Sequence, residues 1–73
     1  MNERIVIDPQ TCHGKPVIRG TRIPVTVVLD ALAGGDSFEM IQSDYDVTAE
    51  DIRACIAFAS TEIKDIRYVS LSA

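Results

Sequence analysis

The sequence predicts a mainly α domain in which a short N-terminal β arm precedes a three-helix bundle with a helix-turn-helix unit. Three observations lead to this class. β-Branched residues and a Gly-Thr turn gather in residues 1–24, apolar residues recur at helical spacing over residues 25–66, and capping residues divide that second region into three helices. Residues 67–73 follow as a tail, for which an extended conformation is expected.

The length of 73 residues corresponds to one domain. Apolar residues make up 47% of the chain, but only two Tyr, two Phe and no Trp are present, so aliphatic side chains must fill the core. A single core of this size typically supplies only about 3–5 kcal/mol of stability. We therefore expect a homo-oligomer, with a dimer favoured, or a partner protein to bury further apolar surface.

The β arm contains one β-branched run and one candidate hairpin. The run Ile5-Val6-Ile7 is ended by Asp8-Pro9, which is a turn signal. In the hairpin, strands at Val17–Arg19 and Arg22–Ile23 flank a Gly20-Thr21 turn, because glycine adopts a positive φ at little cost. Three pairs are then expected to lie opposite one another: Val17 and Pro24, Ile18 and Ile23, Arg19 and Arg22.

The Arg19–Arg22 pair is unfavourable by itself because like charges directly opposite each other repel. We therefore expect it to meet an anion. One reading is that both arginines bind carboxylates or phosphates of a partner, for which the planar guanidinium is well suited. The slightly favoured reading is that they brace the arm on the helices by pairing with acids of this protein, in the same chain or a second copy: for example Asp30, Glu39 or Asp44.

The segment Val25–Ala33 is ambiguous by propensity because its valines favour strands. Its apolar residues nevertheless fall at helical spacing, Pro24 suits a first helical turn, and Gly34-Gly35 suits a helix end, so a helix is expected. Ser37 can cap a second, short helix from Phe38 to about Ser43. Its expected inward stripe consists of Phe38, Ile41 and Tyr45.

Thr48 is expected to cap a long third helix, with Asp51 completing a variant of the capping box. We expect the apolar stripe of this helix to be mainly core, with any surplus forming an oligomer face. The stripe consists of Ile52, Cys55, Ile56, Ala59, Ile63 and Ile66.

The net charge of −4 is unevenly distributed. Residues 1–24 contain four basic and two acidic residues, giving +2, whereas residues 25–73 contain nine acidic and three basic residues, giving −6. An acidic chain lacks the composition of a bulk nucleic-acid binder. The polarity favours head-to-tail contacts between copies or contact with a basic partner.

No catalytic, metal or cofactor site is expected. Cys12 and His13 are adjacent, so in a strand their side chains point to opposite faces, and one His with two Cys is too few for a typical metal site. No phosphate-binding loop pattern occurs, and Cys55 is expected to be a core residue. Because neither a signal peptide nor a membrane-length apolar run is visible, we expect a cytoplasmic protein with reduced thiols.

The motif GKPVIRGTRIPV, followed by AGGDSFE, DYDVTAEDI and AFA, resembles the small bacterial and archaeal proteins catalogued as domain of unknown function 433. The similarity runs from about Ile5 to Ala59. The resemblance implies a homeodomain-like helix-turn-helix fold and similarity to VapB-type antitoxins, many of which are encoded beside a PIN-like ribonuclease.

Two functions follow as hypotheses. In the first, the protein is an antitoxin, not an enzyme, that inhibits a PIN-like ribonuclease and represses its own operon. In the second, it is an oligomeric DNA-binding regulator or interaction module without a toxin partner. Base readout by the third helix is disfavoured because its first turn presents acids. The expected contact residues for DNA or a partner are Arg4, Lys15, Arg19, Arg22 and Arg53.

Overall fold

In the computed structural model, which describes residues 3–66, the arm forms a short ladder between two of its segments. Strand β1 (Ile5–Ile7) runs antiparallel to β2 (Pro16–Ile18), with Val6 opposite Val17 at the centre of the register. A single 3₁₀ turn, η1 (Cys12–Gly14), lies in the connection between them. This two-strand hairpin confirms a β arm, although its second strand forms its full ladder with β1 and only a limited one with the segment after Gly20.

The predicted hairpin around Gly20-Thr21 therefore forms only in part. Val17 and Pro24 are paired as expected, by an isolated bridge. The next pair, Ile18 and Ile23, makes one ladder hydrogen bond, from the Ile23 carbonyl to the Ile18 N–H at 3.0 Å.

The Thr21 side chain ends this second ladder. Its hydroxyl donates to the Ile18 carbonyl at 2.7 Å and accepts from the Ile23 N–H at 3.0 Å, so it stands where the second ladder bond of that pair would form. The Arg19 N–H donates instead to the Arg4 carbonyl at 2.7 Å, which continues the β1–β2 ladder. The predicted pairing of Arg19 with Arg22 is therefore wrong, because the Thr21 hydroxyl closes the loop one pair earlier.

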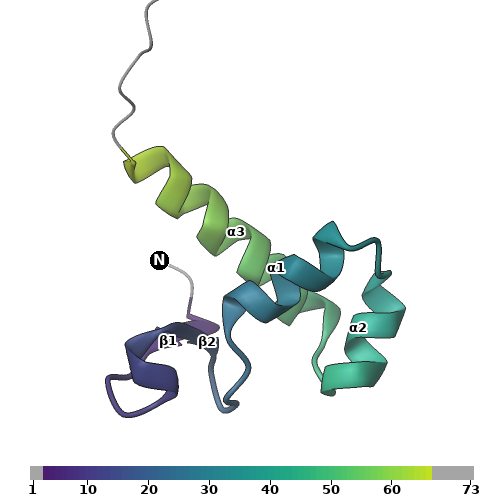
Figure 1. The fold of residues 1–73 in the computed structure, drawn as a ribbon, viewed down its shortest axis with the longest axis horizontal. Helices are drawn as coiled ribbons and strands as arrows, with labels where there is room; N and C mark the ends of the chain where they lie inside the picture. The colour runs from purple at the N-terminus through teal and green to yellow at the C-terminus, as the bar shows by residue number, and fades with distance from the viewer. Residues whose placement is uncertain (1–2, 67–73) are drawn as a thin grey trace, which may run out of the picture.

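Three helices follow the arm (Figure 1): α1 (Val25–Ala33), α2 (Phe38–Tyr45) and α3 (Ala49–Asp65). Helix α1 has the predicted bounds. Helix α2 begins after Ser37, whose hydroxyl accepts from the Met40 N–H at 3.1 Å, and it runs two residues further than predicted. It ends at Asp46, which adopts the left-handed conformation with φ 55°. The mainly helical class is thus confirmed, whereas the predicted tail 67–73 lies outside the described residues.

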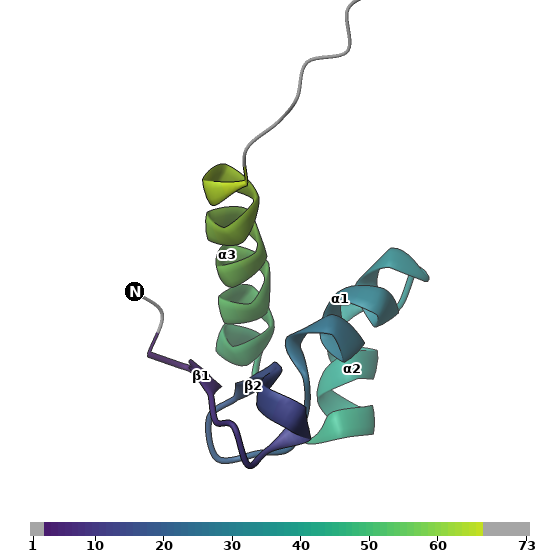
Figure 2. The ribbon, with the colours of Figure 1, turned by 60° about the vertical axis from the view of Figure 1, so that its left-hand side comes forward.

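The core lies where α1, the start of α3, α2 and the arm meet. Ile41 and Ile52 are fully buried there, as predicted for their stripes, whereas Tyr45, the last residue of α2, stays 37% exposed. Figures 1 and 2 show α3 continuing well past the other elements. The buried core residues are Ile5, Val17, Ile18, Val25, Val28, Ile41, Val47, Ile52, Ala54 and Cys55.

Candidate partner-binding surface

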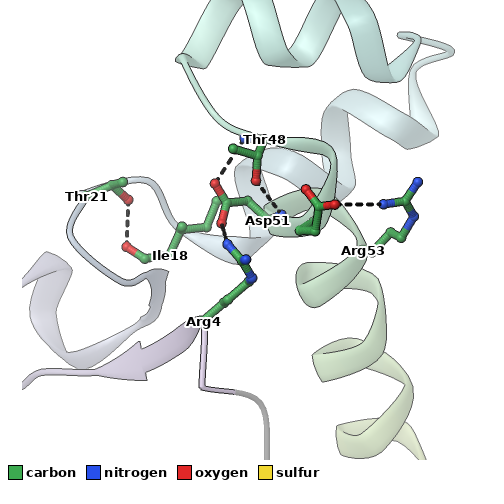
Figure 3. Close-up of polar contacts among 7 residues, drawn as sticks. Arg4, Ile18, Thr21, Thr48, Asp51 and Arg53 are labelled. Atoms are coloured by element: carbon green, nitrogen blue, oxygen red, sulfur yellow. Dashed lines mark hydrogen bonds and ion pairs between the residues drawn. The ribbon is translucent and has the colours of Figure 1, made fainter.

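The arm is tied to the N-terminus of α3 by an ion pair. Arg4, directly before β1, places Nη1 3.0 Å from Oδ1 of Asp51 (Figure 3). The Arg4 side chain is 51% exposed, whereas that of Asp51 is only 15% exposed. One surface charge of the arm is therefore already engaged by the helical body.

Asp51 also completes the capping box of α3. Its Oδ2 accepts from the Thr48 N–H at 3.0 Å, and its own N–H donates to the Thr48 hydroxyl at 3.1 Å. Burial by itself raises the pKa of Asp51, but the hydrogen bonds from the Thr48 N–H and from Arg4 outweigh it and leave this pKa below its usual value. The carboxylate is thus fixed as an anion at the start of α3, as the capping pattern predicted.

An open hollow lies beside this pair. It has a volume of about 310 Å³ and is lined by Glu3, Arg4, Arg19 and Asp51. Both charge signs line it, so the hollow is suited to a polar group that donates and accepts, such as the side chains of a partner protein, better than to a bare anion.

Three further cations of the arm are exposed: Lys15, Arg19 and Arg22. Within residues 3–66, none of their side chains makes a hydrogen bond or an ion pair. The slightly favoured expectation that Arg19 and Arg22 pair with acids of the same chain is therefore not met within the described residues. The brace exists, but Arg4 forms it, because the ladder bond from the Arg19 N–H places Arg4 beside the α3 cap.

Arg53, the remaining predicted contact residue, lies on the first turns of α3. Its Nη1 is 3.9 Å from a Glu50 carboxylate oxygen, and its Cζ is 5.9 Å from the centroid of the Phe38 ring (Figure 3 shows the ion pair). This guanidinium therefore covers the α2–α3 contact. With Glu50 and Asp51 beside it, the start of α3 presents acids where a DNA-reading helix presents donors to bases.

The Cys12-His13 pair occupies the 3₁₀ turn, where both residues have positive φ. The Cys12 thiol donates to the Arg22 carbonyl at 3.3 Å, which links the turn to the segment after β2. Across residues 3–66, no three His, Cys, Asp or Glu side chains come together in a way that could hold a metal ion. No helix in this part of the chain combines the length and apolarity needed to cross a bilayer.

The sequence did not predict the Arg4–Asp51 ion pair. It also did not predict the Thr21 bridge, in which the Thr21 hydroxyl links the Ile18 carbonyl to the Ile23 N–H. A capping aspartate and a cation are visible in the sequence, but 47 residues separate them, and only the fold brings them together. For the Thr21 bridge, the sequence contains no signal other than a threonine directly after Gly20.

The chain matches a known protein family and a curated relative. The family model described as "Protein of unknown function (DUF433)" matches residues 5–59. A Mycobacterium tuberculosis (strain ATCC 25618 / H37Rv) protein named "Putative antitoxin VapB45" is 37% identical over 49 residues, which cover 67% of this chain and 20% of that protein. The chain thus spans about a fifth of the length of this curated relative.

Two solved structures are similar. The crystal structure of a DUF433 member protein from Anabaena variabilis ATCC 29413 has a TM-score of 0.77 and 31% identity, over 84% of this chain and 61% of that one. The crystal structure of Rv2018 from Mycobacterium tuberculosis has a TM-score of 0.65 and 35% identity, over 71% of this chain and 24% of that one. The arm followed by three helices is therefore an arrangement shared with solved relatives.

Proposed function

Because the chain belongs to the DUF433 family, we propose that it is the antitoxin of a type II toxin–antitoxin system. In this role it is a binding protein and not an enzyme. It binds a PIN-like ribonuclease in the cytoplasm, inhibits it by covering its active site or blocking its assembly, and represses its own operon as an oligomer. The observation that carries the proposal is the 37% identity to the protein named as an antitoxin.

The charge distribution supports a nuclease as the partner. A ribonuclease must attract RNA phosphates and therefore carries a basic surface. Residues 25–55 of this chain hold seven acidic residues and one basic residue, and the exposed acids of α1 and α2 include Asp30, Glu39 and Asp44. Such a surface can compete with RNA for the nuclease.

The proposal expects a PIN-like ribonuclease gene beside that of this chain, and co-expression with its product tests it. We expect the growth defect caused by the nuclease to disappear and a complex to elute from a sizing column. The triple variant Asp30→Asn/Glu39→Gln/Asp44→Asn is expected to weaken the complex, and Asp65→Asn, at the far end of α3, serves as its control. Persistent toxicity together with separate elution of the two proteins would show that this chain is not the antitoxin.

The second candidate function is an oligomeric DNA-binding regulator without a toxin partner. It is favoured by the exposed side chains of Lys15, Arg19 and Arg22, which make no polar contact within residues 3–66. In this role they contact phosphates from the arm, and Arg4 and Arg53 contribute at the edges.

Titration of fluorescent upstream DNA at several salt concentrations separates the two functions. A phosphate binder loses affinity steeply as salt rises, and replacing Arg19 and Arg22 together should lower the salt slope by about two. Absent or salt-independent binding would remove the regulator hypothesis and leave the antitoxin proposal untouched.

A further inference from the structure

Helix α3 carries an apolar face that the described fold does not cover. Ile56 and Ile63 are 43% and 53% exposed, and Ile66, the C-cap residue of the helix, is 54% exposed. Ala59, half-buried, lies between them at helical spacing. We name these four residues the α3 stripe. The stripe continues the predicted core face of α3 beyond the end of the core.

We propose that a second copy of this chain covers the α3 stripe, as an antiparallel helix pair related by a two-fold axis. The inference concerns the chain by itself and does not depend on the antitoxin role.

The spacing of the stripe is the first argument. Its positions are separated by three, four and three residues, so the stripe reads the same in both directions along the helix. An antiparallel copy centred on residue 61 therefore places Ile56 opposite Ile66 of the second copy, and Ala59 opposite Ile63. Each apolar position meets another apolar position, which is the self-complementarity that a two-fold interface requires.

The shape of the molecule allows this pairing. The centre at residue 61 lies nine positions beyond Ile52, the fully buried isoleucine of α3, and this is about 14 Å along the helix at 1.5 Å per residue. Figure 2 shows this part of α3 standing clear of α1, α2 and the arm. An antiparallel copy then places its own body at the opposite end of the pair, so the two bodies do not collide.

Charge also favours this face over the rest of the helical body. A second copy is acidic like the first, so the electrostatic repulsion between copies is smallest where basic residues offset the acidic ones. Residues 56–66 carry Glu62, Lys64 and Asp65, a net charge of −1, whereas residues 25–55 carry a net charge of −6. The acidic α1–α2 side is thereby left free for a basic partner.

The size of the interface predicts a weak dimer. Stable specific interfaces bury roughly 800 Å² per partner, and three partly exposed isoleucines on about three helical turns fall short of this. We expect dissociation constants on the order of 10⁻⁵ M, so that the oligomeric state changes over an accessible concentration range.

Sedimentation equilibrium of the whole 73-residue chain, from micromolar to millimolar concentration, tests the proposal. The wild type should change from monomer to dimer. Ile63→Lys should weaken the dimer about tenfold or more, because it removes apolar burial twice and places one charged lysine from each copy in an apolar interface. Met40→Lys is the matched control, since Met40 is 51% exposed but lies on α2, and it should leave the dimer unchanged.

A second pair of variants tests the antiparallel register. Glu62 lies on the flank of the stripe, one residue from the proposed two-fold axis, so the Glu62 carboxylates of the two copies face each other. Glu62→Gln should therefore tighten the dimer a few-fold. Asp65→Asn removes the same charge from the opposite side of the helix and should change the affinity less.

Three results would overturn the proposal. These are a wild type that stays monomeric at millimolar concentration, equal effects of Ile63→Lys and Met40→Lys in proteins that remain folded by circular dichroism, or a dimer that Glu62→Gln weakens. If the wild type is monomeric and Ile63→Lys abolishes nuclease binding, the stripe belongs to the nuclease and not to a second copy.

Discussion

The Arg4 guanidinium and the Asp51 carboxylate, 47 residues apart in the sequence, meet at 3.0 Å and join the β arm to the first turn of α3. The same carboxylate accepts the Thr48 N–H and so completes the helix cap. A single aspartate thus fixes both the start of α3 and the position of the arm. The arm in turn presents the exposed cations that the DNA-binding hypothesis needs.

The ion pair predicts a pH-dependent stability. The folded state lowers the pKa of Asp51 from its usual value of 3.8, so the stability contributed by this carboxylate is present above that value and is lost as the pH falls through the lowered pKa. Asp51→Asn should therefore destabilise the protein at pH 7, and the difference from wild type should shrink below about pH 4. Urea unfolding between pH 7 and pH 3 measures this.

Arg4→Gln separates the ion pair from the cap. Because Arg4 is half exposed, we expect it to cost at most about 1 kcal/mol, and less at high salt. For the pH prediction, a difference in unfolding free energy between wild type and Asp51→Asn that stays constant at every pH would contradict the role of the Asp51 carboxylate.

The Thr21 bridge predicts a sharp difference between two small substitutions. Thr21→Val keeps the shape but leaves the Ile23 N–H without its partner and the Ile18 carbonyl with the Thr21 N–H alone, and it should cost about 1–3 kcal/mol. Thr21→Ser keeps the hydroxyl and should cost much less. Thr26→Val, on the exposed face of α1, is the control, and chemical denaturation compares all three. Equal stability of the Val and Ser variants would show that the bridge contributes little.

Substitution of Gly20 is expected to lower the stability of the protein through backbone conformation alone. A Cβ at this position meets no atom within 4 Å, but its φ of +79° is unfavourable for other residues, so Gly20→Ala should destabilise by about 1–2 kcal/mol. Gly34 has φ −78°, and Gly34→Ala should therefore stay within about 0.5 kcal/mol of wild type. Thermal melts of both variants decide the point, and a neutral Gly20→Ala would mean that the turn can adopt another conformation.

Replacing two cations of the arm is expected to weaken binding without lowering the stability of the protein. The side chains of Arg19 and Arg22 make no polar contact within residues 3–66, so the double variant Arg19→Ala/Arg22→Ala should unfold within about 0.5 kcal/mol of wild type. Its affinity for DNA should fall, whereas Lys64→Ala on α3 should bind DNA normally. A clear drop in melting temperature, or a lost oligomer, would instead restore the bracing role that the sequence suggested.

Cys55 should be chemically protected. Burial raises the pKa of its thiol to about 11, with a further contribution from the Asp51 carboxylate, so about one thiol in a thousand is ionised at pH 8. A native thiol titration should therefore give one fast reaction, from the partly exposed Cys12, and the fast phase should vanish in Cys12→Ser. Two fast phases in the wild type would show that the core at Cys55 opens readily.

The helices could be read from the sequence because their signals are local. Ser37 and Thr48 cap α2 and α3 with the hydroxyl hydrogen bonds that their positions predict, and Ile41 and Ile52 are buried as the stripes require. The ambiguous valines of α1 form a helix because their apolar faces pack against the other elements. A two-residue error at the end of α2 arose because Asp46 ends the helix by adopting a left-handed conformation.

The pairing within the arm could not be read in the same way. Val17 can pair with Val6 or with Pro24, and it does both, because one edge of the strand faces each neighbour. Which residue completes the ladder after Ile18 depends on where the Thr21 hydroxyl and the Arg4 carbonyl lie. These positions are set by contacts between distant segments, and no short motif contains them.

The sequence by itself determined the family, the helices and the separation of a basic arm from an acidic body, since motifs, caps and charges are properties of neighbouring residues. The tertiary structure decided which cations are engaged. It turned Arg4 to Asp51, left the side chains of Arg19 and Arg22 without polar partners among the described residues, and ended the core before Ile63. The physical reason is that ion pairing and burial depend on distances between segments, which only the packed chain defines.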